Sequence, residues 1–170
     1  MKKIFLLSFL LGIGLIGFSQ KYAIIDTRYI LDKMPEYKQA QQQLDDIAAD
    51  WQKEIDRNQM QLDKMYKDYD AEQVMLSDDL KKKREDQLFN KEKELRDLQR
   101  KRFGYEGDLF KKRQELVKPI QDKVYNAVQK LAVQRGYDLV LDKSEGITII
   151  FADPKLDKSE DVLKELGIRN

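Results

Sequence analysis

The apolar positions of this chain follow a heptad pattern over a long stretch. They alternate in steps of four and three at Leu44, Ala48, Trp51, Ile55, Leu62, Met65 and Tyr69. Asn58 fills the remaining position of this seam with a polar side chain. An amphipathic helix on a globular core would carry a wider apolar stripe, whereas a narrow seam among Gln, Asp, Lys and Glu is typical of a coiled coil. The pattern predicts a coiled-coil helix from about residue 37.

A second seam follows a predicted turn near residues 75–77, where Ser77 and Asp78 offer oxygens that cap a helix N-terminus. Its apolar members are Leu88, Leu95, Leu98, Phe103, Phe110, Val117, Val124 and Leu131. Lys91 and Arg102 interrupt the series. The pattern predicts one long helix over about residues 78–135.

The charges of the two predicted helices favour their pairing with each other. Residues 36–79 carry 12 acidic and 5 basic side chains, whereas residues 80–113 carry 13 basic and 7 acidic ones. Opposite net charges attract, so an antiparallel hairpin within one chain is favoured. At ~1.5 Å per residue, arms of roughly 40 residues would reach about 60 Å.

Two glycines, Gly104 and Gly107, fall inside the second predicted helix. Each costs about 0.5–1 kcal/mol relative to alanine in a helix interior, so their presence needs a reason. In a hairpin that turns near residue 76, Trp51 lies close to Gly104, and the glycines would make room for its ring. Alternatively, they form a flexible point in the arm. Both interpretations stay open, and Gly104 and Gly107 are the candidate residues for arm flexibility.

Short strand patterns near the two ends of the chain predict a small sheet. Residues 22–25 read Tyr-Ala-Ile-Ile, and further strands are expected at residues 137–141 and 147–151, on either side of a turn at 144–146. Three short strands bury too little apolar surface to be stable alone, so we expect oligomerisation through this body. Its candidate residues are Ile24, Leu139, Leu141, Ile147, Ile149 and Phe151.

The fold class that follows is α+β: a long antiparallel coiled-coil helical hairpin inserted into a small β-sheet body. The arm covers residues 35–118. The body comprises residues 21–34 and 119–170, with a short final helix that Ser159 would cap.

Residues 1–20 form a separate segment with the anatomy of a secretory signal peptide. Two lysines follow the first Met, and an apolar run over residues 4–18 leads to small residues near Ser19. We therefore expect export to the periplasm, with cleavage near Ser19 or Gln20.

The composition argues against catalysis and against a cofactor. The chain has no His and no Cys, so catalytic triads, thiol nucleophiles and the usual zinc ligands are lacking. No phosphate-binding glycine loop occurs. Asp26 and Asp142 end predicted strands and are expected to serve structure. Loss of Lys2 and Lys3 with the signal peptide leaves 30 basic against 31 acidic residues. We expect no enzyme activity, no cofactor, no metal and no nucleic-acid partner.

The order of these features resembles the Skp/OmpH family of periplasmic chaperones. The resemblance rests on the export signal, the charged hairpin, the closing apolar segment and the stretches YAIIDTRYILDKMPEYKQAQ, KPIQDKV and YDLVLD. It implies a jellyfish-like homotrimer, with a β-barrel-like body and three helical tentacles around a cavity, that binds unfolded outer-membrane β-barrel proteins without ATP. The best-known members are strongly basic, so no lipid or lipopolysaccharide contact is carried over to this near-neutral chain.

Adaptable apolar residues toward the tip of the hairpin suit a surface that meets many partners. Met65 and Tyr69 lie on the seam, and packing explains them equally well. Tyr66, Phe89 and Met75 are the candidate client contacts. The alternative function is a structural or adaptor coiled coil of the cell envelope. Such a rod would be expected to fill its seam, whereas polar residues interrupt this one.

Overall fold

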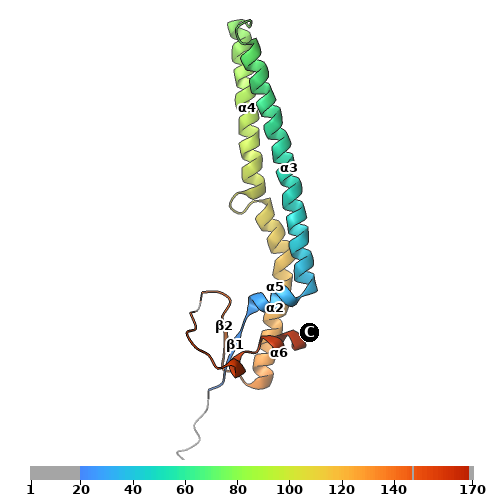
Figure 1. The fold of residues 1–170 in the computed structure, drawn as a ribbon, viewed down its shortest axis with the longest axis vertical. Helices are drawn as coiled ribbons and strands as arrows, with labels where there is room; N and C mark the ends of the chain where they lie inside the picture. Colours follow the sequence, from blue (N-terminus) through green and yellow to red (C-terminus); the bar gives the residue numbers. More distant parts are fainter. Residues whose placement is uncertain (1–19, 147, 169–170) are drawn as a thin grey trace, which may run out of the picture. The chain divides into compact units, whose positions relative to one another are not determined.

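The computed structural model describes residues 20–146 and 148–168 (Figure 1). Residues 1–19 of the predicted signal peptide and the body candidate Ile147 lie outside the described residues. The chain divides into two compact units: a terminal unit, Met1–Ile30 with Val124–Asn170, and an arm unit, Leu31–Lys123. The elements are, in chain order, β1 Tyr22–Ile25, α2 Thr27–Lys33, α3 Pro35–Glu72, α4 Asp78–Phe103, α5 Asp108–Arg135, β2 Leu139–Asp142, a 3-10 turn Pro154–Leu156 and α6 Ser159–Glu165.

The arm unit is built on the antiparallel pair of α3 and α4. Helix α3 ends at Glu72, the chain reverses, and α4 begins at Asp78. Ser77 holds the N-cap position of α4, but its side chain makes no capping hydrogen bond. The buried seam residues of the pair are Ile55, Leu62, Leu88 and Leu95, with Met65, Tyr69 and Leu98 packed against them. Burial of each such aliphatic side chain contributes about 1.5–3 kcal/mol, and the predicted helical hairpin is confirmed.

The polar residues that interrupt the two seams contact each other across the pair. The Lys91 Nζ atom donates to the Asn58 Oδ1 atom at 2.9 Å, and the Asn58 amide nitrogen donates to the Glu54 carbonyl. Since both side chains are only part-buried and find partners, neither leaves an unpaired polar group in the seam. A polar pair at one level of a coiled coil fixes which residues face each other.

The single helix predicted over residues 78–135 is wrong, because α4 ends at Phe103 and α5 begins at Asp108. We call residues 104–107, between the two helices, the break loop. Gly104 leaves the helical conformation at φ −68° and ψ 174°. Glu106 has a positive φ of 51°, which is uncommon outside glycine, Asn and Asp.

The atoms nearest to the break-loop glycines belong to the backbone of the chain itself rather than to the ring of Trp51. A Cβ atom on Gly104 would lie 2.3 Å from the carbonyl oxygen of Arg100, and one on Gly107 would lie 2.8 Å from that of Lys101. Both clashes are with the backbone of the last turn of α4. The glycines therefore allow the chain to pass close to the helix that it has just left.

The terminal unit contains a two-stranded parallel sheet formed by β1 and β2. A crossover connection of many residues between parallel strands is the expected arrangement, and here the arm unit lies within that connection. Tyr22, Ala23, Ile24 and Ile25 stand opposite Leu139, Val140, Leu141 and Asp142. The prediction that β1 finds its partner after the second long helix is confirmed.

The third strand predicted at residues 147–151 does not form among the residues that the structure describes. Residues 148–151 have no regular secondary structure. The second edge of β1 is partly taken, because Ile24 bridges Asp157 and its carbonyl accepts from the Lys158 amide at 2.8 Å. Residues 148–151 pair with neither strand, so the apolar character of this segment predicted a strand that does not form.

The core of the terminal unit gathers apolar side chains from β1, α2, α5 and α6. Its buried members are Ala23, Ile24, Ile25, Ile30, Val124, Ala127, Leu131, Val162 and Leu163. Ser159 is the first residue of α6 rather than its cap, and the Asp157 side chain accepts from the Ser159 amide at 2.9 Å. Gly136 and Gly167, with φ of 66° and 78°, follow the ends of α5 and α6 as expected of helix C-termini.

Candidate functional site

Exposed apolar side chains occur at several levels of the otherwise charged arm unit. They come from α3, the reversal, α4, the break loop and the start of α5: Met60, Tyr66, Val74, Met75, Leu80, Phe89, Phe103, Tyr105 and Phe110. Single exposed apolar residues are common on protein surfaces, but here they include four aromatic rings within the 22 residues from Phe89 to Phe110. Such a surface can contact apolar partners without any one deep pocket.

The three residues that the sequence offered as client contacts differ in their surroundings. Met75 and Phe89 are exposed, with 79% and 61% of their surface accessible. Tyr66 is 37% exposed, but its hydroxyl donates to a carboxylate oxygen of Glu92 across the helix pair. Tyr69 makes the same kind of bond to Glu85 at 2.6 Å. Tyr66 thus already links α3 to α4, and it is less open to a partner than Met75 or Phe89.

The bond between Tyr66 and Glu92 changes the acidity of both groups. The hydrogen bond to Glu92 raises the pKa of Tyr66, since the carboxylate stabilises the protonated hydroxyl. Bonds from Tyr66 and then Arg96 lower the pKa of Glu92. Both shifts stabilise the protonated phenol and the ionised carboxylate, so this link between the helices persists at neutral pH.

The sequence did not single out Tyr105, Val74 or Leu80, although these residues are 97%, 84% and 50% exposed. Val74 precedes Met75 within the reversal and Leu80 lies in the first turn of α4, so apolar side chains are exposed on both sides of Met75 along the chain. The available signal for Tyr105 was its position between two glycines, which indicated a departure from the helix.

A part-buried arginine, Arg102, anchors the two helix ends at the break loop. The Nη2 atom of Arg102 lies 3.1 Å from Glu54 on α3, and its Nη1 atom lies 2.9 Å from Asp108 at the start of α5. The guanidinium stands over the ring of Trp51, 4.7 Å from its centroid, and Phe103 packs edge-on against the same ring at 6.3 Å. The side chain of Arg102 is only 22% exposed. It therefore joins α3, α4 and α5 at one point.

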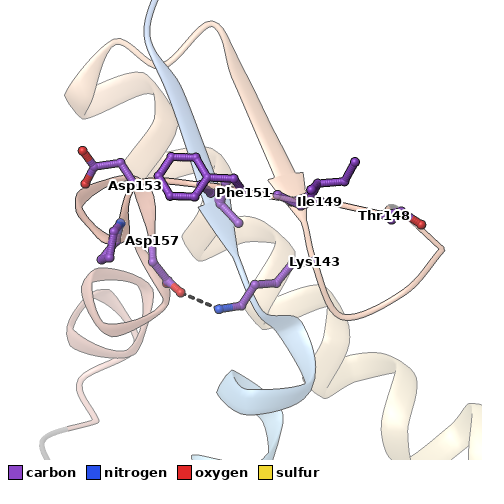
Figure 2. Close-up of a pocket in the computed structure, with 10 residues that line it drawn as sticks. Lys143, Thr148, Ile149, Phe151, Asp153 and Asp157 are labelled. Carbon is purple, nitrogen blue, oxygen red and sulfur yellow. Dashed lines mark hydrogen bonds and ion pairs between the residues drawn. The ribbon is translucent and has the colours of Figure 1, made fainter.

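The terminal unit has a separate hollow of about 620 Å³ beside β1. Figure 2 shows Ile149 and Phe151 on the segment that passes next to β1, and the dashed ion pair between Lys143 and Asp157. Ile24, Ala152 and Pro154 add further apolar wall. Apolar residues form most of the lining, so the hollow can make apolar contacts with a partner. The Lys143 Nζ atom lies 2.7 Å from the Asp157 Oδ2 atom, so the charge of this lysine is already paired.

The ionisable groups around the hollow serve the fold. The hydrogen bond to Asp157 raises the pKa of Lys143. Burial opposes ionisation of Asp157, but hydrogen bonds from Lys143 and Ser159 outweigh it and lower its pKa. Asp142 behaves likewise: burial is outweighed by bonds from Thr27 and Ser144, and its pKa is lowered. The oxygens of these carboxylates accept from neighbouring backbone and hydroxyl groups, which is a structural role.

The body candidates from the sequence fall into two groups in the terminal unit. Ile24 is buried in the core, while Leu141 and Ile149 are part-buried. Leu139 and Phe151 are exposed, and they are joined by further exposed apolar residues: Tyr22, Tyr125, Val133 and Ile150. Ile150 and Phe151 are 96% and 85% accessible. A chain of this size rarely leaves two adjacent large apolar residues so open without a partner.

Comparison with known proteins decides the family. The family model described as outer membrane protein (OmpH-like) matches residues 21–166. The chain belongs to the OmpH-like family. The family resemblance predicted from the sequence is therefore confirmed. In addition, none of the helices within the described residues is both long and apolar enough to cross a membrane.

Two relatives of this OmpH-like chain illustrate how far the similarity extends. An uncharacterised protein of Aquifex aeolicus is 31% identical over 166 residues, which are 98% of this chain and 96% of the relative. The crystal structure of a proposed outer membrane chaperone (OmpH-like) from Caulobacter crescentus matches with a TM-score of 0.70 at 15% identity. That match covers 88% of this chain and 85% of the other. At this identity the structural likeness shows the shared fold.

Proposed function

We propose that the mature chain is a periplasmic holdase that binds unfolded outer-membrane β-barrel proteins without ATP. The observation that carries this proposal is the set of exposed apolar and aromatic side chains on the charged arm unit. Membership of the OmpH-like family and the chaperone description of the Caulobacter crescentus relative support it. A protein that binds only the unfolded state of a client lowers the concentration of free unfolded client, and aggregation slows accordingly.

Aggregation of a client provides the test. An outer-membrane β-barrel protein is diluted from urea into buffer with the mature chain, without nucleotide, and light scattering is followed. We expect suppression at near-stoichiometric ratios. A double variant, Met75→Ser with Phe89→Ser, should suppress less, because two exposed apolar contacts are removed. Substitution of Gln61, an exposed polar residue of α3, by Ser is the matched control.

The opposite result would favour a different role for the chain. If the mature protein leaves scattering unchanged while it remains folded and exported, the holdase proposal is wrong. The structural or adaptor coiled coil of the envelope then becomes the better description. N-terminal sequencing of the periplasmic fraction tests export in the same strain, with cleavage expected near Ser19 or Gln20.

We further propose that the terminal unit holds the chain in a homotrimer. In the described residues β2 pairs only with β1, so one edge of β2 is open, and Leu139, Ile150 and Phe151 are exposed beside the sheet. A free edge and open apolar side chains are the features that a second copy would cover.

A further inference from the structure

The break loop presents one aromatic side chain almost completely to solvent. Tyr105 is 97% exposed, more than any other large apolar residue of the described chain. Figure 1 shows the break loop projecting from the arm unit on the side away from α3. Phe103 and Phe110, at the adjoining ends of α4 and α5, are 39% and 46% exposed. Phe103 packs against Trp51 of α3, so Tyr105 is the ring that the loop itself presents to solvent.

The arm is built to hold this loop in place. Arg102, near the end of α4, binds Glu54 on α3 and Asp108, the residue directly after the loop. Gly107 is buried, and its amide donates to the Gly104 carbonyl at 2.9 Å, so the loop is closed on itself. The ring of Tyr105 is therefore presented on a fixed support. A loop whose backbone is already ordered loses little backbone entropy when its aromatic side chain contacts a partner.

The charges around the loop are predominantly positive. Lys101, Lys111 and Arg113 lie within eight residues of Tyr105, are exposed, and make no ion pair among the described residues. Glu106 is the one acidic residue of the loop itself, and the carboxylate of Asp108 is already bound to Arg102. Exposed cations without partners attract carboxylates, so the charge complement of this surface is an acidic partner.

We propose that the break loop is a docking site for acidic, aromatic-rich segments of unfolded polypeptide. Tyr105 would contact an aromatic or aliphatic side chain of the segment, while Lys101, Lys111 and Arg113 would pair with neighbouring carboxylates. This inference rests on the proposed holdase function and adds the chemistry of the segment that is bound. A basic surface with an aromatic ring also suits single-stranded nucleic acid, but such sites place successive rings for successive bases. One fully exposed ring favours a polypeptide.

Binding of two labelled peptides to the full mature protein tests the proposal. Both peptides are 20 residues long and carry the same tyrosines and leucines, with glutamates between them in one and lysines in the other. We expect the glutamate peptide to bind more tightly. Tyr105→Ala should weaken its binding about tenfold, and Tyr105→Phe should restore it, since the ring supplies the contact. Gln61→Ala, which truncates an exposed polar residue of α3, is the control and should leave binding unchanged.

A second variant tests the electrostatic part. The double variant Lys111→Gln with Arg113→Gln should weaken binding of the glutamate peptide several-fold. The affinities of the two peptides should then differ less. The proposal is overturned if Tyr105→Ala binds the glutamate peptide as tightly as the parent, if the two peptides bind equally, or if neither binds. Tighter binding of a 20-nucleotide oligothymidylate that depends on Tyr105 would assign the surface to nucleic acid instead.

Failure of this inference is separable from failure of the proposed function. Suppression of client aggregation by the parent protein reports on the holdase, whatever the peptides do. If suppression is intact and Tyr105→Ala changes neither assay, only the docking site is wrong. Thermal unfolding of each variant confirms that the fold is retained, which is expected because the Tyr105 side chain is open to solvent.

Discussion

Single polar residues determine how the two arm helices face each other. Asn58 and Lys91 meet at 2.9 Å within seams that are otherwise apolar, and any sliding of one helix along the other would separate them. An Asn at a seam position costs stability and in return specifies the pairing. Two of the three interruptions in the heptad pattern, Asn58 and Lys91, are therefore one interaction, which the sequence alone could not show because they lie 33 residues apart.

A double-mutant cycle at Asn58 and Lys91 tests this pairing. Asn58→Leu alone should lower the free energy of unfolding by about 1–2 kcal/mol, because the part-buried ammonium of Lys91 loses its partner. The double variant, with Leu at both positions, should regain this loss or exceed the parent. Urea unfolding at fixed protein concentration measures both, with Gln61→Leu as the exposed control. Additive effects of the two substitutions would contradict the pairing.

Asp142 should make the stability of the terminal unit dependent on pH. The pKa of Asp142 is lowered in the folded state. Its ionised carboxylate therefore stabilises the fold fully at pH values above the pKa of an unfolded aspartate. This stabilisation is lost as the pH falls through the lower pKa of the folded state. Asp142→Asn should therefore be less stable than the parent at neutral pH, and the difference should shrink on acidification.

Urea unfolding at several pH values provides the measurement for Asp142. Asp45→Asn, on the exposed face of α3, is the control. A difference between Asp142→Asn and the parent that stays constant down to strongly acidic pH would show that the carboxylate charge is not responsible.

At the scale of elements, the heptad pattern predicted α3 well, because the steps of four and three residues continue along its whole seam without a shift. It missed the end of α4, since Phe103, Phe110 and Val117 continue at steps of seven across the break loop. The first two of these residues are in fact exposed. The apolar residues at 147–151 likewise predicted a strand, but residues 148–151 have no regular secondary structure. Local pattern indicates the type of an element, and tertiary contacts decide whether it forms and where it stops.

Gly104→Ala should destabilise the arm unit by about 1–3 kcal/mol, a cost typical of a forced close contact. Its Cβ atom would lie 2.3 Å from the carbonyl oxygen of Arg100, and this backbone group cannot move without disturbing the last turn of α4. Thermal and urea unfolding measure the effect. Gln114→Ala, on the exposed surface of α5, is the control and should be neutral or slightly stabilising. Unchanged stability of Gly104→Ala would mean that the loop adapts readily and would support the flexible interpretation.

At the scale of the whole molecule, assembly should depend on residues that are exposed within one chain. Phe151→Asp leaves the fold of a single chain nearly unaffected, because Phe151 is 85% exposed, but it would place a charge in the interface of a trimer. We expect a shift to monomer at micromolar concentration, since an unpaired buried charge costs several kcal/mol, on the order of an interface hot spot. Light scattering coupled to gel filtration measures the mass.

The control for this prediction is Val74→Asp, which adds the same charge at the exposed tip of the arm unit and should leave the mass unchanged. A monomeric mass for the parent protein, or a trimeric mass for Phe151→Asp, would contradict assembly through this surface. The first result would exclude the trimer itself, and the second would only relocate its interface.

The break loop also lets the apolar side of α5 point in a different direction around the helix axis from the apolar side of α4. A seven-residue line through Leu88, Leu95 and Arg102 reaches residue 116, one short of Val117, the first of the buried α5 positions Val117, Ile120, Val124, Ala127 and Leu131. In an unbroken helix this offset would turn the apolar side by about 100°. The loop absorbs that turn, so one residue added between Tyr105 and Glu106 should break the bond between the Gly107 amide and the Gly104 carbonyl but leave the helix pair folded. One residue added between Leu88 and Leu95 should unfold the hairpin, and comparison of the two insertions by circular dichroism would reveal the difference.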